Sequence, residues 1–420
     1  MPKPDRSPRL DLLFGGISQA SSQGVTSCPA GGGYPTLRQA LGMSPQALIA
    51  EVEAAQLRGR GGAGYPTAHK LSATAAGAGP RYLIANADEG DPSVYKDSTL
   101  LSRVPERVIE GMLIAAWAVQ AEQAYIYLGG KHPECRQPLN AALAAAHERG
   151  LLGQDICGSG WNLCIDIVES DGLFVRGDSG AVVNTIEGRP PEPEVRYGRH
   201  LASSGLWGRP TLLLNVETLA CLPAIIELGG TQFAALGSPH NGGSKLFSVA
   251  GCVARPGLYE LRMGSTLGQL LEASGGLAPG ATLQAVLLGG PSGSLCGPEA
   301  LDWQLDYDLP ERSGASIHAG GVSFLAEDCD LVQVVLDNLA FLVSESCGQC
   351  LPCREGLPLL EQLLRGLASG SSKPQADLKL LKQTIALMRN LSTCGLGSSA
   401  GTSLESLVVR FPERLGLCQG

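Results

Sequence analysis

The pattern of hydrophobic and polar positions predicts an α/β layer in the first half of the chain. Short apolar runs at residues 82–85 and 124–128 have the length of buried strands, and helical periodicity lies between and after them. Before them, apolar positions recur at helical spacing after Ser44, a typical N-cap; these are Leu48, Ile49, Val52 and Ala55. We therefore expect an α/β domain over residues 37–236. Residues 1–36, rich in Ser, Gly and Pro, predict an irregular N-terminal arm.

A second pattern begins after the Asn-Gly-Gly sequence at residues 241–243. Residues 245–251 and 257–261 predict two strands joined by an Arg-Pro-Gly turn, and a short helical pattern and a strand at 285–288 follow. This β-β-α-β order is typical of a ubiquitin-like fold, so we expect a β-grasp domain over residues 240–325.

The last part of the chain, residues 326–420, is predicted to be helical. Thr402 and Glu405 have capping-box spacing before its final helix. The helical segments are 331–343, 357–367, 378–391 and 404–409. Four such helices predict a small bundle.

Composition narrows the classes of function. The 420 residues suit two or three domains, and a net charge of -9 makes nucleic acid an unfavourable partner. With 44% hydrophobic and 17% charged residues, the surface is expected to be partly covered by other subunits. The most apolar stretch, residues 112–119, is too short to cross a bilayer and predicts a buried helix. No secretory signal is recognisable, so we expect a cytoplasmic protein, at most peripheral to a membrane complex.

The cysteines carry the most specific chemical signal. Thirteen cysteines in a chain of this size favour metal ligation over a disulfide framework. Cys347, Cys350 and Cys353 have C-x2-C-x2-C spacing, which suits three ligands of a [4Fe-4S] cluster. Structural zinc and a thioredoxin-like dithiol are the alternatives; zinc sites more often use two separated pairs or histidines.

A fourth cluster ligand must come from elsewhere in the chain. In the bacterial ferredoxin pattern it would stand at position 357, which is leucine here. We expect Cys394, at the end of the third predicted helix, rather than Cys329 or Cys418.

Two further segments predict a cofactor site. Gly59, Gly61 and Gly64 form a G-x-G-x-x-G sequence, but it follows a predicted helix, so an ordinary Rossmann dinucleotide fingerprint does not apply. Its backbone N–H groups can still face an anion, with Lys70 as countercharge; a tight structural turn is the alternative.

The other segment is acidic and follows the strand at 82–85, where ligand-binding residues of α/β sheets lie. Asn86, Asp88 and Glu89 can hydrogen-bond a flavin or its hydroxyls, and Asp91 stands two residues further on. The alternative is a solvated acidic turn that caps a helix.

These motifs together resemble the flavin-bearing, NADH-oxidising subunit of respiratory complex I and its relatives in NAD-linked hydrogenases and formate dehydrogenases. The resemblance runs over about residues 37–415 and rests on segments 57–67, 86–89, 205–211, 215–219, 345–356 and 394–397. It implies a Rossmann-like FMN domain, a β-grasp domain of the SLBB type and a helical domain with one [4Fe-4S] cluster.

The resemblance also implies roles for individual residues. Asp91 and Asp178 would be catalytic, and Cys347, Cys350, Cys353 and Cys394 would hold the cluster. The cofactor-binding residues would be Gly59, Arg60, Gly61, Gly62, Gly64, Tyr65, Lys70, Asn86, Asp88, Glu89, Gly177, Ser179, Asn215 and Thr218. The implied partners are a thioredoxin-like [2Fe-2S] subunit and a further iron-sulfur subunit, with NAD(H) as candidate substrate.

The sequence departs from the family on the NADH side of the implied pocket. Asp178 and Ser179 replace two glutamates, and a serine cannot supply the carboxylate acceptor. The other departures are Ala73 and His200 in place of phenylalanines, Leu214 in place of an asparagine, and residues 128–130 in place of Arg-Gly-Glu. We therefore expect an electron-input subunit passing electrons between NADH, FMN and the cluster; the alternative is an FMN and iron-sulfur relay that has lost NADH binding.

Overall fold

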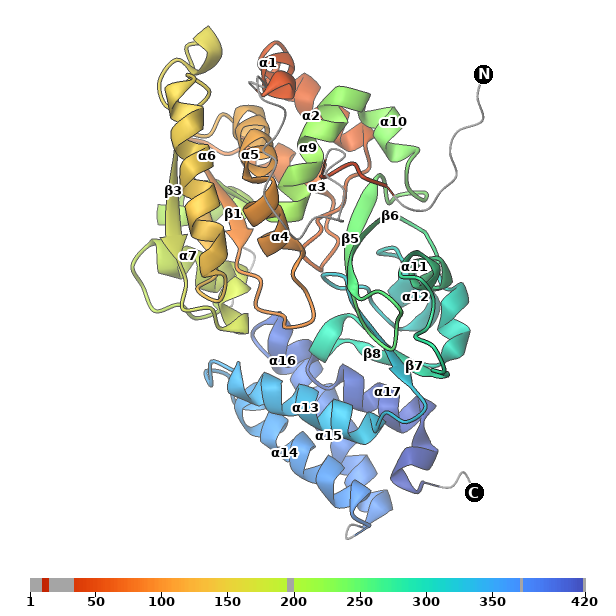
Figure 1. The fold of residues 1–420 in the computed structure, drawn as a ribbon. Coiled ribbons are helices and arrows are strands. Elements are labelled where there is room, and N and C mark those ends of the chain that lie inside the picture. Colours follow the sequence, from red (N-terminus) through yellow and green to blue (C-terminus); the bar gives the residue numbers. More distant parts are fainter. Residues whose placement is uncertain (1–9, 15–33, 195–199, 371–372, 418–420) are drawn as a thin grey trace.

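A computed structural model describes residues 10–14, 34–194, 200–370 and 373–417. Figure 1 shows an α/β domain in the upper part of the molecule, a smaller β-rich domain beside it and a helical domain below both. This arrangement agrees with the three predicted domain types. Along the described residues, no helix combines the length and hydrophobicity that a bilayer crossing requires.

The α/β domain is built on a four-stranded sheet with the order β3-β2-β1-β4, in which all neighbours are parallel. The strands are β1 (Tyr82–Ala87), β2 (Gln123–Leu128), β3 (Cys164–Glu169) and β4 (Thr211–Asn215). Because the strand order reverses between β1 and β4, their carboxyl ends form the switch point at which α/β folds bind ligands. The predicted strands 82–85 and 124–128 are thus confirmed.

Helices surround this sheet. Ser44 caps α2, as predicted, by accepting a hydrogen bond from the amide of Ala47 at 3.2 Å. Residues 112–119 lie in α5, which is buried along almost its whole length. The helices are α1 (Pro35–Leu41), α2 (Pro45–Ala54), α3 (Thr67–Ala75), α4 (Lys96–Arg103), α5 (Pro105–Val119), α6 (Arg136–Glu148), α7 (Ser179–Ile186), α8 (Leu201–Ser204), α9 (Val216–Leu228) and α10 (Gly230–Ala234). Short 3-10 turns are η1 (Pro133–Cys135), η2 (Ile156–Gly158), η3 (Phe174–Gly177) and η4 (Leu206–Gly208).

The β-rich domain has a five-stranded mixed sheet with the order β6-β5-β9-β7-β8, in which only β5 and β9 are parallel. Its elements are β5 (Ser244–Gly251), β6 (Gly257–Arg262), α11 (Leu267–Ala273), β7 (Leu283–Leu288), β8 (Ser294–Cys296), α12 (Leu309–Ser313) and β9 (Gly321–Ala326), with the turns η5 (Gly290–Ser292) and η6 (Pro298–Asp302). The predicted hairpin, helix and strand are confirmed. Two strands were not predicted from the sequence: β8, which is only three residues long, and β9, the central strand that pairs with β5 and β7.

The C-terminal domain is helical, as predicted. It contains α13 (Leu331–Ser344), α14 (Leu351–Ala368), α15 (Pro374–Leu391), α16 (Gly395–Ser399), α17 (Thr402–Arg410) and the turn η7 (Pro412–Leu415). Helix α14 begins before the predicted residue 357, because the cysteine segment has no apolar periodicity to announce it. The predicted capping box is wrong: Gly401 is the N-cap, and the Thr402 hydroxyl instead donates to the Ser399 carbonyl at 2.7 Å.

Part of the N-terminal arm is packed rather than irregular. The amide of Leu10 donates to the Glu260 carbonyl at 3.0 Å, and the amides of Leu12 and Leu13 donate to the Glu260 carboxylate at 2.9 and 3.0 Å. Leu13 and Phe14 are buried in the main hydrophobic core. This segment therefore ties the α/β core to β6, and the other arm residues before Tyr34 lie outside the described residues.

Candidate functional site

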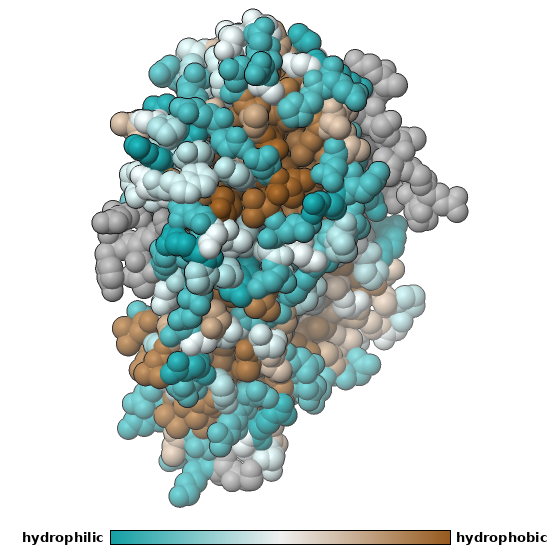
Figure 2. Space-filling view, turned by 90° about the vertical axis from the view of Figure 1, so that its left-hand side faces the viewer, coloured by the Kyte–Doolittle hydropathy of each residue, from teal (hydrophilic) through white to brown (hydrophobic). Residues whose placement is uncertain are grey.

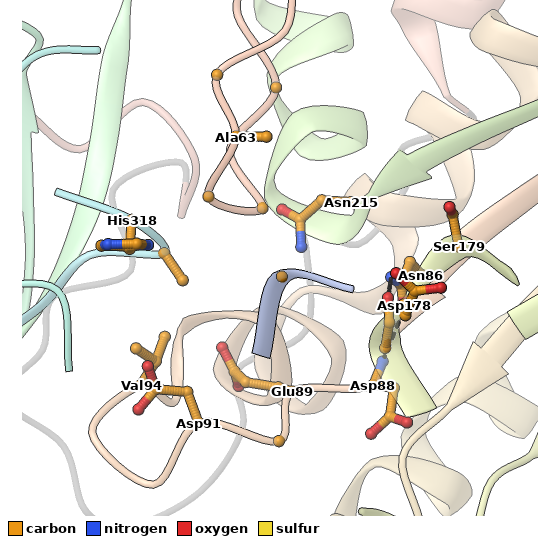
Figure 3. A pocket seen from close by; sticks show the side chains of 18 of the residues that line it. Ala63, Asn86, Asp88, Glu89, Asp91, Val94, Asp178, Ser179, Asn215 and His318 are labelled. Carbon is orange, nitrogen blue, oxygen red and sulfur yellow. Dashed lines mark hydrogen bonds between the residues drawn. The ribbon is translucent and has the colours of Figure 1, made fainter. Parts of the chain in front are cut away.

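A cavity of about 690 Å³ lies at the carboxyl ends of β1 and β4, and all three domains line it. Its volume falls within the range of about 300–1,000 Å³ that is usual for cofactor sites. The close view in Figure 3 shows the glycine loop above the cavity, Glu89 and Asp91 below it, and Asn215 between His318 and the group of Asn86, Asp178 and Ser179.

The glycine loop connects α2 to α3 and forms one wall of the cavity. A Cβ on Gly61 would lie 3.1 Å from the Asn215 side chain, and a Cβ on Gly64, whose φ is +62°, would lie 2.5 Å from the Tyr307 ring. Side chains at these positions would fill the space that the loop leaves open. Gly59, Gly62 and Tyr65 also line the cavity, and the Tyr65 ring is 53% exposed.

Arg60 does not line the cavity, although it stands within the glycine motif. Its guanidinium is fully buried and donates to the Gly242 carbonyl at 2.6 Å, while its amide donates to the Thr218 hydroxyl at 2.8 Å. Arg60 therefore anchors the loop, and its side chain is not positioned to contact a cofactor.

The acidic segment leaves β1 at the floor of the cavity. The Asn86 amide donates to the Gly177 carbonyl at 3.0 Å, and the Asp88 carboxylate accepts from the Ser170 hydroxyl at 2.9 Å. Burial raises the pKa of Asp88 to about 6. Asp88 therefore offers an acceptor to ligand hydroxyls in a site that disfavours additional negative charge.

Glu89 and Asp91 line the cavity but have internal partners. The Glu89 carboxylate accepts from the amides of Asp97 and Ser98 at 2.9 and 3.0 Å, so it caps the start of α4. Asp91 accepts from the amide and hydroxyl of Ser93 at 2.8 and 2.7 Å. The helix-capping interpretation of this segment thus holds for Glu89.

Positive partial charge gathers where β4 ends. Asn215 caps α9, and its side-chain oxygen accepts from the Glu217 amide at 3.0 Å and from the Lys96 ammonium at 3.2 Å. Thr218 follows in the first turn of α9, and Lys70, whose pKa burial lowers, donates to the Leu213 carbonyl at 3.2 Å. The Asp97 carboxylate already binds the Lys96 ammonium and the Glu217 amide at 2.8 and 3.1 Å, so Lys70 and the remaining N–H groups of the first turn of α9 are the features that fit an anionic group such as the FMN phosphate.

Lys96 was missed by sequence analysis. Its ammonium is buried and pairs with Asp97 at 2.8 Å and with Glu217 at 3.2 Å. Burial opposes its charge, but these carboxylates raise the pKa of Lys96 above its ordinary value. The sequence signal was weak, because a Lys-Asp pair at a helix start is common on protein surfaces.

The segment from Gly177 to Ser179 lines the cavity at the start of α7. Asp178 is the N-cap of this helix, and one of its oxygens accepts from the Gly180 amide at 2.8 Å. Ser179 is exposed. Residues 128–130 are another segment that differs from the family. A Cβ on Gly129 would lie 2.7 Å from an Asp88 oxygen and one on Gly130 would lie 2.6 Å from the Ser170 carbonyl, so this loop leaves no room for larger residues.

Cys347, Cys350, Cys353 and Cys394 surround a second, smaller cavity between α14 and α16. Burial raises the pKa of the Cys353 thiol and raises that of Cys394 to about 11, whereas hydrogen bonds from Thr393 and Cys353 outweigh burial and lower the pKa of Cys350. In the described part of the chain, no three side chains of His, Cys, Asp or Glu converge tightly enough for one metal ion. Four cysteines that line one cavity, three of them at C-x2-C-x2-C spacing, are the usual ligand set of a cubane cluster.

The two cavities adjoin one another. Val175, Cys394 and Leu396 line both of them. Of the other candidates for the fourth ligand, Cys329 does not line the smaller cavity, and Cys418 lies outside the described residues. The β-rich domain contributes Tyr307 and His318 to the larger cavity, and no sequence motif predicted either of them.

Comparisons with known proteins agree with this arrangement. Residues 52–224 match the Nuo51 FMN-binding domain, residues 246–298 the SLBB domain, and residues 333–416 the NADH-ubiquinone oxidoreductase-F iron-sulfur binding region. The chain is 37% identical to the F 2 subunit of NADH-quinone oxidoreductase of Rhizobium meliloti, over 92% of both chains. It is 35% identical to NADP-reducing hydrogenase subunit HndC of Solidesulfovibrio fructosivorans, over 90% of this chain and 77% of that one.

A solved structure is also similar. The crystal structure of an NAD+-reducing [NiFe]-hydrogenase in the H2-reduced state matches with a TM-score of 0.81 and 36% identity. The match covers 92% of this chain, which spans 65% of the length of the hydrogenase chain.

Proposed function

Since this chain belongs to the family of the NADH-quinone oxidoreductase F subunits, we propose that it is the electron-input subunit of a multisubunit oxidoreductase, passing electrons between NADH, FMN and one [4Fe-4S] cluster. The observation that carries the proposal is that Cys394 and Leu396 line both the glycine-loop cavity and the four-thiol cavity. When bound, FMN accepts electrons in pairs as hydride and releases them singly, and a cubane cluster takes one at a time.

The chain's own residues would hold these groups as follows. The glycine loop and the N-terminus of α9, with Asn215 and Lys70, supply N–H groups and positive charge for a phosphate. Asn86, Asp88 and Gly177 line the cavity and would bond the polar edge and hydroxyls of the flavin. Cys347, Cys350, Cys353 and Cys394 would ligate the cluster, with Ser346 3.3 Å from the Cys353 sulfur as an outer hydrogen-bonding partner.

The test is an anaerobic preparation of the full chain. We expect about one FMN and four iron and four sulfide per chain, with flavin bleaching on addition of NADH. Cys394→Ser should lose the cluster, whereas the matched change Cys329→Ser, outside the thiol cavity, should keep it. A colourless preparation, or one mole of zinc held by the four thiols, would refute the proposal.

A second candidate is an FMN and iron-sulfur relay that does not use NADH. It is favoured by the cavity wall near α7, where the Asp178 carboxylate caps the helix and Ser179 offers only a hydroxyl. In this case dithionite would bleach the flavin but NADH would not. Asp91 and Asp178 remain proposed catalytic residues only under the first candidate.

Partners are expected from the family and from the surface. On the face shown in Figure 2, hydrophobic residues gather over the α/β domain and again over the lower, helical part. Leu351, Leu387 and Leu391 of the helical domain are between 48% and 65% exposed, and such exposure is typical of interfaces. We propose a cytoplasmic complex with a thioredoxin-like [2Fe-2S] subunit and a further iron-sulfur subunit, to be identified by anaerobic co-purification.

A further inference from the structure

His318 brings an imidazole from the β-grasp domain into the FMN cavity. It lies in the loop before β9 and lines the cavity. Its φ is +42°, a left-handed conformation that non-glycine residues rarely adopt. In the described part of the chain the only hydrogen bond of His318 runs from its backbone amide to the Ser316 hydroxyl, at 3.3 Å, so the ring nitrogens have no protein partner. Strained residues of this kind gather at functional sites.

Packing holds His318 against the glycine loop. The buried Lys245 ammonium donates to the Ala319 carbonyl at 2.9 Å and to the Arg60 carbonyl at 3.2 Å, which clamps the two segments together. A Cβ on Gly62 would lie 3.7 Å from the Ala319 nitrogen, so the two backbones are close to contact. On the other side, a Cβ on Gly289 would lie 2.5 Å from the imidazole, and glycine there leaves room for the ring.

The ends of the cavity differ in chemistry. Val175 and Cys394 line both cavities, and Asp178 follows Val175 by three residues, so the side that carries Asp178 is the side near the four thiols. Figure 3 shows Asn86, Asp178 and Ser179 on that side and His318 on the opposite side, with Asn215 between them. For transfer to the cluster, the flavin ring must lie toward Cys394. The phosphate tail then extends away from it, past the N-terminus of α9 and toward His318.

We propose that His318 binds the phosphate group of FMN. The inference rests on the proposed function of the cavity. Burial lowers the pKa of His318, so the neutral imidazole can donate one N–H without taking up a proton. Burial raises the pKa values of Glu89 and Asp91, the acidic groups that line the same cavity, which favours their uncharged forms and reduces their repulsion of a phosphate.

The experiment compares FMN with riboflavin, which has the same ring and no phosphate. The full chain is freed of flavin, and binding is followed by quenching of flavin fluorescence. For His318→Gly we expect about tenfold weaker FMN binding, the worth of one hydrogen bond to a charged group, and unchanged riboflavin binding. Thermal stability should not fall, since glycine adopts φ +42° without strain.

Two conservative variants provide the control. The amide nitrogens of His318→Asn and His318→Gln stand near the places of the Nδ1 and Nε2 atoms, so one of them should recover much of the FMN affinity. Equal loss of FMN and riboflavin, or no loss of either, would overturn the role at the phosphate while leaving the proposed function intact. If the unmodified chain bound neither flavin, both the proposed function and this inference would fail.

Discussion

The buried charge cluster of Glu217, Lys96 and Lys245 leads to a specific prediction about stability. Glu217, on α9, is fully buried and pairs with Lys96 and Lys245, each at 3.2 Å, and accepts from the Leu246 amide at 2.7 Å. Lys96 also forms an ion pair with Asp97, but Glu217 is the only carboxylate that pairs with Lys245 among the described residues. Since Lys245 belongs to β5 and Glu217 to α9, this cluster joins two of the three domains that line the cavity.

Glu217→Gln keeps the shape of the side chain and leaves Lys245 buried without a countercharge. Breaking a buried pair on one side costs about 3–5 kcal/mol, and we expect the free energy of unfolding to fall by that amount. Glu217→Gln combined with Lys245→Met should recover more than half of the loss, because a buried pair replaced as a whole is nearly neutral. The assay is urea unfolding of the full chain, followed by tryptophan fluorescence.

The pH dependence of the single variant has a definite sign. Burial already lowers the pKa of Lys245 to about 8, and loss of Glu217 would lower it further. The folded chain then binds fewer protons than the unfolded chain, so stability rises with pH and the deficit of the variant shrinks between pH 7 and pH 9. A loss below about 1 kcal/mol, or a double variant less stable than both single ones, would refute the reasoning.

Three further predictions concern the cavity walls. The pKa of Asp88 is about 6 in the folded chain and 3.8 ordinarily, so the stability of the folded chain falls as pH rises from about 4 to about 6. Asp88→Asn should therefore raise the melting temperature at pH 7 and not at pH 3. A lower melting temperature of the variant at pH 7 would contradict this. The Glu345 carboxylate accepts from the Lys131 ammonium at 3.0 Å and lies two residues before Cys347, so it holds the start of the cysteine loop. Glu345→Gln should therefore release iron to a chelator several-fold faster. An unchanged rate would show that this contact does not hold the loop. Gly64→Ala should abolish FMN binding, because its Cβ would collide with the Tyr307 ring. Gly208→Ala, with a similar φ of +72° and open space around it, should cost only about 1 kcal/mol of stability. Equal effects of the two variants on FMN affinity would argue against a role of the glycine loop in FMN binding.

Much of the fold was predictable because its signals are local. The strands at β1 and β2, the hairpin of β5 and β6 and four helices of the C-terminal domain follow from periodicity over a few residues, whereas the five-residue α16 was not predicted. The gathering of Cys394 with the three clustered cysteines was predictable from ligand chemistry.

The rest depends on long-range packing, which single residues do not announce. Arg60 belongs to the glycine motif, yet its side chain is drawn into the domain interface by the Gly242 carbonyl. Lys96 resembles a surface lysine in the sequence and becomes a buried partner of Glu217 only when α4 meets α9. His318 carries no motif, and its place in the cavity follows from the clamp between Lys245 and Ala319.

Because three domains line one cavity, cofactor loading and domain assembly must be thermodynamically linked. A ligand that binds only the assembled form stabilises it by about 2.7 kcal/mol when present at a hundred times its dissociation constant. Cys394 and Leu396 line both cavities, so under the proposed function ligation of a cluster by Cys394 would order a wall that the flavin also contacts. It follows that loading of either cofactor should raise the affinity for the other, and linkage requires the two factors to be equal.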